Sequence, residues 1–536
     1  MRRVLLIGIS IISLIATFAP AQAALPPTIK VTWNTLQYAG PRLQSSQYLG
    51  SGTVAEDGKL YQFINISLAP CQSLKAIQEK ESDCINFIEV KNGSGEWVKG
   101  KFLNFVPAKW TGNSEVEFSD EVVNFKGVEK LSIPNGSRAA IWDFPGVSHS
   151  GGSDFLFSFD FSSGAVNGVP GWDQSTIQTF LNPVSIVDKF TPGKGSGSTS
   201  ITDDTRGTCI QNAERIYCLK GQPFPKDLRF RVQIKLNALK SALQSRSWFF
   251  GTAINPSYEQ KTDPSDKNSI LLTLQGDPIH VQVPELNIPR DRSIVEAYAT
   301  SWLTELEKLK FYGPSMITKV VDSMMSSAYG DGQDATNQYS TRAFKGIEPF
   351  LKYATIEERS GWGFSTLGAV PGTSPYYQKF MSCPVENKIG GLVSSNATAT
   401  EPGPPIFNST DGTLEYRVAA PHTKANGDLN IGTYSVSIGN TTAKCLWGSN
   451  FKNARASVSM VSDDGTTQIA TSTFTSDENG LRFYVSGFHY SSGAIKIKLT
   501  TSKSKSVTIT CKKGKVVRSV SGANPKCPPG FKTALK

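Results

Sequence analysis

The chain has 536 residues, with 55 Lys and Arg against 45 Asp and Glu and a formal net charge of +10. Two arginines precede residue 24 and twelve basic residues follow Glu478, the last acid, so the rest has 41 basic against 45 acidic residues. The body is slightly acidic, which excludes a uniformly basic protein and points to a polyanion partner for the C-terminal end.

Residues 1–23 have the pattern of a secretory signal peptide: a start with two arginines, an apolar run over 4–18 and a small-residue site at 21–23. The mature chain then begins at Ala24 and has room for about three domains. No later run of about 20 apolar residues predicts a membrane span, and no cysteine near residue 24 predicts a lipid anchor. We expect a protein that is secreted or held at the cell surface.

Residues 24–190 form the first predicted domain, which is β-rich. Short alternating segments such as KVTWNTLQY, EWVKGKFLNFV and DFLFSFDF are separated by Gly, Asn and Ser turns. Residues 191–207 are rich in Gly and Ser and predict a flexible linker or loop. The GKGSGST stretch within it lacks the spacing of a phosphate-binding loop.

Residues 208–399 predict an α+β domain. The strands DLRFRVQIKL and SILLTLQGDPIHVQV come first. Apolar residues then recur at helical spacing over 293–309, between Pro289 and Gly313, and a second helix is predicted over 314–328. The fold class is therefore mainly β with an α+β middle region.

Residues 400–406 form a Pro-rich linker, and residues 407–502 contain about seven short strands with turns at 426–427, 464–465 and 479–480. This spacing predicts an Ig-like β-sandwich that folds on its own from about Pro404 onward. Within it, AKCLWG is predicted to be a core strand, with Trp447 used for packing.

Residues 503–536 predict a small tail module. SVTITC and KVVRSVSG can pair across 512–514, and cysteines at 511 and 527 can staple the hairpin. Strand alternation places Lys513, Lys515 and Lys526 on one side and leaves Lys512 and Arg518 elsewhere. The lysines could keep an edge strand soluble, or they could hold a polyanion. The predicted polyanion contacts are Lys512, Lys513, Lys515, Arg518, Lys526 and Lys532.

Eight cysteines suit an exported protein, because an oxidising compartment lets disulfides persist. Three pairs are near neighbours in sequence, and the fourth joins the two that remain. Structural zinc is disfavoured, because no two cysteines have the close spacing that a zinc site needs. The predicted disulfides are Cys71–Cys84, Cys209–Cys218, Cys383–Cys445 and Cys511–Cys527.

The SHSGG stretch at 148–152 partly matches the nucleophile elbow of serine hydrolases, with Ser150 as the nucleophile. A serine replaces the first glycine, however, and SDFLFSFDF after it alternates as a strand does. An elbow needs a helix there. The turn interpretation is therefore favoured, and Ser150 remains the single catalytic candidate.

No pattern predicts a metal or cofactor. The four histidines at 149, 280, 422 and 489 occur singly. Glu115 and Glu117 share a strand face and read as solvated residues. The stretch YGDGQDATNQ at 329–338 has oxygen ligands without the register of a known calcium loop.

Several stretches carry a resemblance: AKCLWG, SSGAIKIKLT, TCKKGK and NPKCPPGFK over the last 120 or so residues, and DCINFIE and IWDFPG earlier. They resemble a group of exported actinobacterial proteins with a C-terminal sandwich and a basic tail. The resemblance implies export and a modular β-rich build, and it supplies no catalytic residue.

Two hypotheses of function follow. The first is an exported, non-catalytic binding or scaffold protein of the cell envelope, whose tail contacts an anionic surface polymer or polysaccharide. The alternative is an extracellular hydrolase whose site lies in the α+β domain, assembled from residues distant in sequence. Nucleic acid is the least favoured partner, because the tail has a single aromatic residue, Phe531, for stacking. A deep pocket with several ionisable groups would favour the enzyme.

Overall fold

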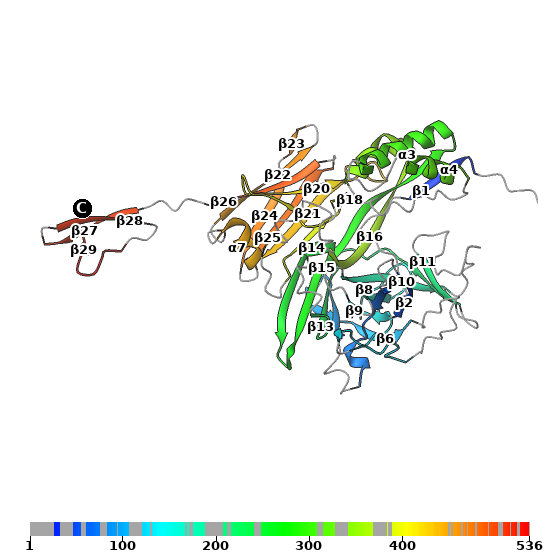
Figure 1. Ribbon diagram of the computed structural model, residues 1–536, viewed down its shortest axis with the longest axis horizontal. Helices are drawn as coiled ribbons and strands as arrows, with labels where there is room; N and C mark the ends of the chain where they lie inside the picture. Colours follow the sequence, from blue (N-terminus) through cyan, green and yellow to red (C-terminus); the bar gives the residue numbers. More distant parts are fainter. Residues whose placement is uncertain are drawn as a thin grey trace, which may run out of the picture.

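The described part of the chain is built mainly from β-strands (Figure 1). Glu115, Glu117, the stretch 329–338, the signal peptide and residues 191–206 of the predicted linker lie outside it. The computed structural model describes residues 26–32, 47–54, 60–75, 83–93, 95–106, 121–128, 131–166, 169–170, 175–187, 207–211, 216–240, 248–307, 315–326, 341–367, 383, 389–401, 403–448, 451, 454–462, 465–468, 470–477, 480–490, 493–501, 507–514, 516–522 and 526–534.

Twenty of the strands in these ranges form one extended hydrogen-bonded sheet. Its strands from the first 190 residues are β1 (Thr28–Thr32), β2 (Gln47–Val54), β3 (Leu60–Ile66), β4 (Cys84–Lys91), β5 (Trp97–Lys99), β6 (Lys101–Phe105), β7 (Ala140–Asp143), β8 (Asp154–Val166), β9 (Val169–Pro170) and β10 (Thr176–Val187). The later ones are β11 (Gly207–Gln211), β12 (Ile216–Gly221), β13 (Arg229–Leu236), β14 (Trp248–Asp263), β15 (Asp266–Pro289), β16 (Ala354–Leu367), β17 (Gly391–Ser395), β21 (Ile431–Gly439), β24 (Thr471–Ser476) and β25 (Gly480–His489).

Strand β8 carries the alternation that the sequence shows. Its four phenylalanines at 155, 157, 159 and 161 are buried in the main core cluster. Antiparallel ladders with β3 and β10 flank it. The predicted strand is confirmed, and its apolar face builds the first core because side chains two apart in a strand share a face.

Several ladders join strands from the two sides of the predicted 191–207 segment. Strand β4 pairs with β13, from Lys91 opposite Arg229 to Cys84 opposite Lys235. Strand β10 pairs with β16, and β1 pairs with β15. The same core cluster takes residues from β8, β13 and β16. Residues 24–190 and 208–399 therefore share both hydrogen bonds and a hydrophobic core.

Strand β15 changes partner along its length. Residues 270–276 pair with β13, whereas residues 279–286 pair with β16. Its end, over 285–289, pairs with β1. The change from β13 to β16 falls at Asp277 and Pro278, which pair with Ile254 and Ala253 of β14.

The helices cover the far end of β15 (Figure 1). They are α3 (Arg292–Glu307), α4 (Ser315–Ser326), α5 (Thr341–Ile347) and the 3-10 turn η5 (Glu348–Tyr353). The carboxylate of Asp291 accepts hydrogen bonds from the amides of Ser293 and Ile294, which caps α3. Both helices predicted between residues 293 and 328 are confirmed.

Two facing sheets enclose the C-terminal core. One contains β18 (Ala399–Thr400), β19 (Ile406–Asn408), β20 (Thr413–Ala419), β22 (Ala454–Ser462), β23 (Thr467–Gln468) and β26 (Gly493–Thr501). The other is the part of the large sheet formed by β17, β21, β25 and β24. Their core also takes Trp248 and Phe250 from β14, so it includes side chains from far outside residues 407–502.

The prediction of a core strand at AKCLWG is wrong. These residues lie in helix α7 (Asn440–Trp447), which ends at Gly448 with a φ of 77°. Ala443 and Leu446, three residues apart, are buried, so the apolar residues fit a helical face better than strand alternation. Trp447 does pack against the core, and its indole N–H donates to the carbonyl of Gly412 at 2.8 Å.

The tail forms a three-stranded sheet of β27 (Val507–Lys513), β28 (Val516–Gly522) and β29 (Lys532–Thr533), with β27 in the middle. Figure 1 shows it apart from the rest of the described chain. The predicted hairpin is confirmed, because Lys513 and Val516 face each other across the turn.

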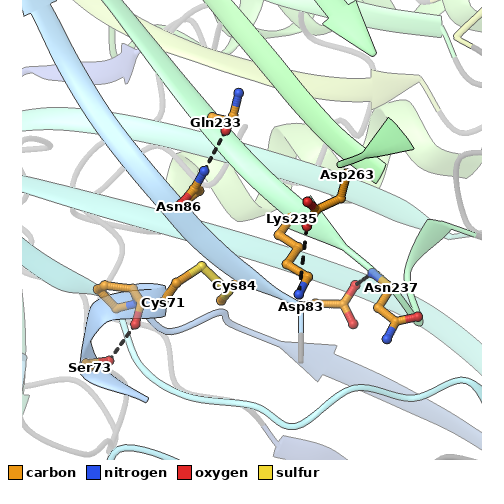
Figure 2. Close-up of a disulfide and its surroundings, with 10 residues drawn as sticks. Cys71, Ser73, Asp83, Cys84, Asn86, Gln233, Lys235, Asn237 and Asp263 are labelled. Carbon is orange, nitrogen blue, oxygen red and sulfur yellow. Dashed lines mark hydrogen bonds and ion pairs between the residues drawn. A yellow bond between two sulfur atoms is a disulfide. The ribbon is translucent and has the colours of Figure 1, made fainter. Parts of the chain in front are cut away.

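Three predicted disulfides are confirmed: Cys71–Cys84, Cys383–Cys445 and Cys511–Cys527. Cys218 is also disulfide-bonded, and the register of β11 and β12 places Cys209 opposite it. Figure 2 shows the first bridge at the start of β4, beside Asp83 and the pair of Lys235 with Asp263, whose charged atoms lie 3.9 Å apart. This bridge ties η1 (Cys71–Ser73) to the central sheet.

Candidate functional site

The tail sheet carries its basic residues on both faces. Cys511 faces Arg518 across the hairpin, and Lys512 faces Lys532 on the other neighbour of β27. Paired residues in a ladder share a face, so Lys513 and Arg518 lie on one face with Cys511, whereas Lys512 and Lys532 lie on the opposite face. The expectation that Arg518 lies apart from Lys513 is wrong, because the hairpin register pairs Arg518 with Cys511.

One face of the tail sheet is covered by the segment that follows the second cysteine. The Arg518 guanidinium lies 5.3 Å from the centre of the Phe531 ring, within range of a cation–π contact. A Cβ added to Gly530 would meet the Lys513 Nζ at 3.1 Å, so the Lys513 side chain extends across that glycine. The disulfide and Phe531 thus form the small core of the tail, with cations around it.

All the described basic residues of the predicted contact set are exposed: Lys512, Lys513, Arg518, Lys526 and Lys532. Lys515, the sixth, lies outside the described residues. No acidic residue follows Glu478 in the sequence. The tail therefore presents positive charge in several directions without an internal counter-charge.

Ser150 lies in a tight turn ahead of β8, in which His149 and Gly152 form a backbone bridge. Its hydroxyl donates to Gln222 Oε1 at 2.8 Å. The chain continues into β8 and not into a helix, so no helix N-terminus faces this hydroxyl. The nearby His149 bonds the carbonyl of Asp154 at 2.9 Å, and burial lowers the pKa of His149.

The histidines are far apart in sequence, and each one that the structure shows bonded has a different partner. His422 Nδ1 bonds the carbonyl of Tyr490 at 2.8 Å, and His280 Nδ1 lies 3.1 Å from Glu358 Oε1. Within the described ranges, no three His, Cys, Asp or Glu side chains gather closely enough to hold a metal ion. The same ranges contain no helix that is long and apolar enough to cross a membrane.

A cleft that sequence reasoning missed opens where β15 changes partner. It has a volume of about 700 Å³ and is lined by residues from the end of β4, from 225–229, from β15 and β16, and from the loop after β20. We call it the charged cleft. Its lysines are Lys91, Lys226 and Lys424, of which the first and the last are more than three hundred positions apart in the chain.

Two of the three acids that line the charged cleft, Asp277 and Glu358, bond neighbouring side chains. Asp277 Oδ1 accepts a hydrogen bond from Arg229 Nη1 at 2.7 Å. Glu358 bonds His280 through one oxygen and accepts from Gln282 Nε2 through the other, at 3.0 Å. A carboxylate on Nδ1 fixes the orientation of an imidazole, so His280 is held in place on the cleft wall.

The only sequence signal for this arrangement is a pair of short polar alternations, His280 with Gln282 and Glu358 with Ser360. The register of β15 and β16 brings them together, with His280 opposite Ser360 and Gln282 opposite Glu358. Neither alternation can be interpreted until the two strands are known to pair.

Fold and site together define a β-rich, disulfide-bonded protein with a charged cleft and a separate cationic tail. The chain matches no protein-family model, no curated protein and no solved structure.

Proposed function

We propose that the protein is exported and acts, without catalysis, as a binding or scaffold protein of the cell envelope, whose tail holds an anionic surface polymer or polysaccharide. The observation that carries the proposal is the tail sheet, with five described cations exposed on both faces and no acid. Binding of this kind releases counterions and is sensitive to salt.

The position of the charges favours a ligand over simple edge protection. Protective lysines belong on edge strands, where they prevent pairing with another sheet. Here Lys512 and Lys513 lie on the central strand β27, whereas the edge strand β28 exposes Val516 and Val517 at 53% and 56%. The central position of Lys512 and Lys513 supports contact with another molecule. Arg518 and Lys532 lie on the edge strands β28 and β29.

The remaining parts of the proposal follow the sequence. Residues 1–23 direct export and are removed, and the protein is one of the exported actinobacterial group that its C-terminal stretches resemble. The layers around residues 407–502 act as an Ig-like sandwich that carries the tail.

The test is a pull-down of the mature protein on isolated cell envelope across a salt series. The test variant carries Gln at Lys512, Lys513, Lys526 and Lys532. We expect strong binding at low salt and a steep loss with salt for the natural protein. The four substitutions should lower the slope of log affinity against log salt by about 3, from roughly 0.7 to 0.9 per lost contact.

The matched control places Arg at the same four positions, which keeps the charge. This variant should bind as the natural protein does. Equal binding by the Gln variant and the natural protein, or binding that salt leaves untouched, would mean that the tail does not hold the polymer.

A hydrolase is the second candidate function, and the charged cleft favours it. His280 is oriented by Glu358, and Ser360 lies on the same face of the β15–β16 ladder. The Ser360 hydroxyl accepts from the amide of Phe224 at 2.9 Å, which leaves its own proton to donate. A serine, a histidine and a carboxylate are the residue types of nucleophilic hydrolysis. Here Ser360 is opposite His280 in the ladder, but it does not line the cleft and its described hydrogen bond is to Phe224.

This candidate is tested by incubating the protein with acidic and neutral polysaccharides and with ester substrates, and by measuring released reducing ends and acid. Activity that falls by about a hundredfold in both His280→Gln and Ser360→Ala would establish it. If the natural protein is inactive, or is no more active than the two variants, the hydrolase candidate is rejected and the binding function remains.

A further inference from the structure

The charged cleft has the size and position of a ligand site. Its volume of about 700 Å³ lies within the usual range of small-molecule sites. It is formed where residues from three predicted domains meet, through Lys91, the 225–229 segment with β15, and Lys424. Clefts at such junctions are common sites of binding because walls from different segments enclose the ligand.

The cleft has four basic side chains, Lys91, Lys226, Arg229 and Lys424, against three acids, Asp227, Asp277 and Glu358, so its formal charge is positive by one. Arg229 is paired with Asp277, and Glu358 bonds His280 and Gln282. By contrast, none of Lys91, Lys226 and Lys424 forms an ion pair with any residue that the structure describes. A concave wall with three such ammonium groups attracts anions, because the low-dielectric protein around it focuses the field.

The rest of the lining favours a ligand with hydroxyl groups. The carboxylate of Asp227 is exposed at the cleft, on a residue held at a φ of 59°, and can accept from hydroxyls. The apolar part of the lining consists of Pro225, Leu228 and Pro278. No Trp, Tyr or Phe is among the lining residues, so a nucleic-acid base would find no ring to stack on.

We propose that the charged cleft binds one or two units of an acidic saccharide. Lys91, Lys226 and Lys424 contact its carboxylate or sulfate groups, and Asp227 accepts from its hydroxyls. The polymer class rests on the proposed function of the tail, whereas the site itself does not, because the cleft and the tail share no residue.

The experiment uses the mature full chain with Lys512, Lys513, Lys526 and Lys532 changed to Gln, which removes four of the six predicted tail contacts. Isothermal titration calorimetry measures its binding to a tetragalacturonate, to a heparin tetrasaccharide and to a neutral maltotetraose. We expect binding of at least one acidic saccharide and none of the neutral one. The uronate and sulfate arms identify which anion the cleft prefers.

Two further triple variants are made in this background. Lys91, Lys226 and Lys424 changed to Gln should weaken binding at least about tenfold, since each ammonium makes a charge-assisted bond. The matched control changes Lys126, Lys267 and Lys319, which are exposed and outside the cleft, and should stay within about twofold. A third variant with Arg at the three cleft positions should bind, which separates loss of charge from loss of fold.

The inference is overturned if no acidic tetrasaccharide binds, if the neutral one binds equally, or if the control triple weakens binding as much as the cleft triple. Failure of the tail proposal is seen separately, in the envelope pull-down, because that comparison changes only tail residues.

Discussion

Asp83 shows how one buried side chain joins two ladders. Its carboxylate accepts hydrogen bonds from the amides of Asn237, Ala238 and Leu239, at 2.9 to 3.0 Å, just after β13 ends. Figure 2 shows the bond from Asn237. The next residue, Cys84, is fixed by its disulfide to Cys71. The end of β13 is therefore held to the start of β4 by a charge that is almost wholly removed from water.

Burial raises the pKa of Asp83 from 3.8 to about 6, against the opposing effect of the three amides. The folded protein thus binds this proton more tightly than the unfolded chain does. The contribution of Asp83 to stability is greatest below about pH 4 and is lost as the pH rises through about 6.

We therefore predict that the natural protein loses about 2 kcal/mol of unfolding free energy, relative to Asp83→Asn, between about pH 4 and pH 7. Urea unfolding of both proteins across this range measures the difference. Asn does not titrate, so groups common to both proteins cancel. A difference that stays constant with pH would show that Asp83 is ionised at both ends of the range.

Among individual residues, the disulfides could be predicted from the sequence, whereas contacts between distant residues could not. The disulfides Cys71–Cys84 and Cys511–Cys527 followed from proximity in sequence, because short loops close most easily. Cys383–Cys445 followed because it joins the two cysteines that remain. The role of Asp83 and the orientation of His280 depend on partners about 155 and 78 positions away, for which one sequence holds no signal. The face of Arg518 required the hairpin register, since a shift of one residue moves a side chain to the other face.

Among the elements, α7 depends on a distant contact. Cys445 on this helix is bonded to Cys383, 62 positions earlier, and both lie at the C-terminal core. A segment of mixed Thr, Ala, Leu and Trp has no strong preference for helix or strand, so tertiary packing decides its secondary structure. This is why the strand prediction for AKCLWG failed while the longer helices over 293–328 were predicted correctly.

We expect the double change Cys383→Ser and Cys445→Ser to lower the unfolding free energy by about 4 kcal/mol, as a loop of this length gives in the chain-entropy model. The matched control is Cys511→Ser with Cys527→Ser, which removes a bridge from the separate tail sheet. Differential scanning calorimetry should show a lower main transition for the first pair of changes and an unchanged one for the second. Equal shifts would contradict the separation of the tail.

The contacts of β21 bear on whether the C-terminal region folds alone. This strand pairs with β17 on one side, and its core takes Trp248, Phe250 and Val393. Cys445 also needs Cys383. These partners, namely β17, the three core residues and Cys383, all lie before Pro404.

A fragment of residues 404–536, expected from composition to be independent, is therefore predicted to lack a cooperative thermal transition. The full mature chain should show one, followed by circular dichroism and tryptophan fluorescence. A second fragment that begins at Trp248 keeps these partners and should recover part of the transition. Cooperative melting of the shorter fragment would show that β17 and β14 are dispensable.

For the whole molecule, composition predicted separate domains, whereas the hydrogen bonds of the sheets join these regions. The Gly-rich and Pro-rich stretches predicted boundaries at 191–207 and 400–406, and several ladders join strands across them. Sheets pair strands at long sequence separation, so a local pattern gives the strands but not their partners. The charged cleft is lined by residues from several of these regions. No single segment of the sequence could therefore predict it.

The tail and the charged cleft offer two positive surfaces in one chain, so a long acidic polysaccharide can contact both. Once one surface is bound, the second meets the polymer at a high effective concentration, which strengthens binding by about 10²- to 10⁴-fold where both contacts can form. We predict that affinity for the natural protein rises with polymer length from a tetrasaccharide to a long polyuronate. Biolayer interferometry on immobilised polymers of graded length measures this rise.

The variant with Gln at Lys512, Lys513, Lys526 and Lys532 should lose most of this dependence on length while keeping the tetrasaccharide affinity, because the cleft is intact. The triple cleft variant should lose tetrasaccharide binding and keep a weaker, salt-sensitive affinity for the long polymer. Combining the tail and the cleft substitutions in one variant should abolish binding of both the tetrasaccharide and the long polymer. If the combined variant binds the long polymer no more weakly than the tail variant or the cleft variant, the two surfaces do not act on the same polymer. One of them would then have another partner.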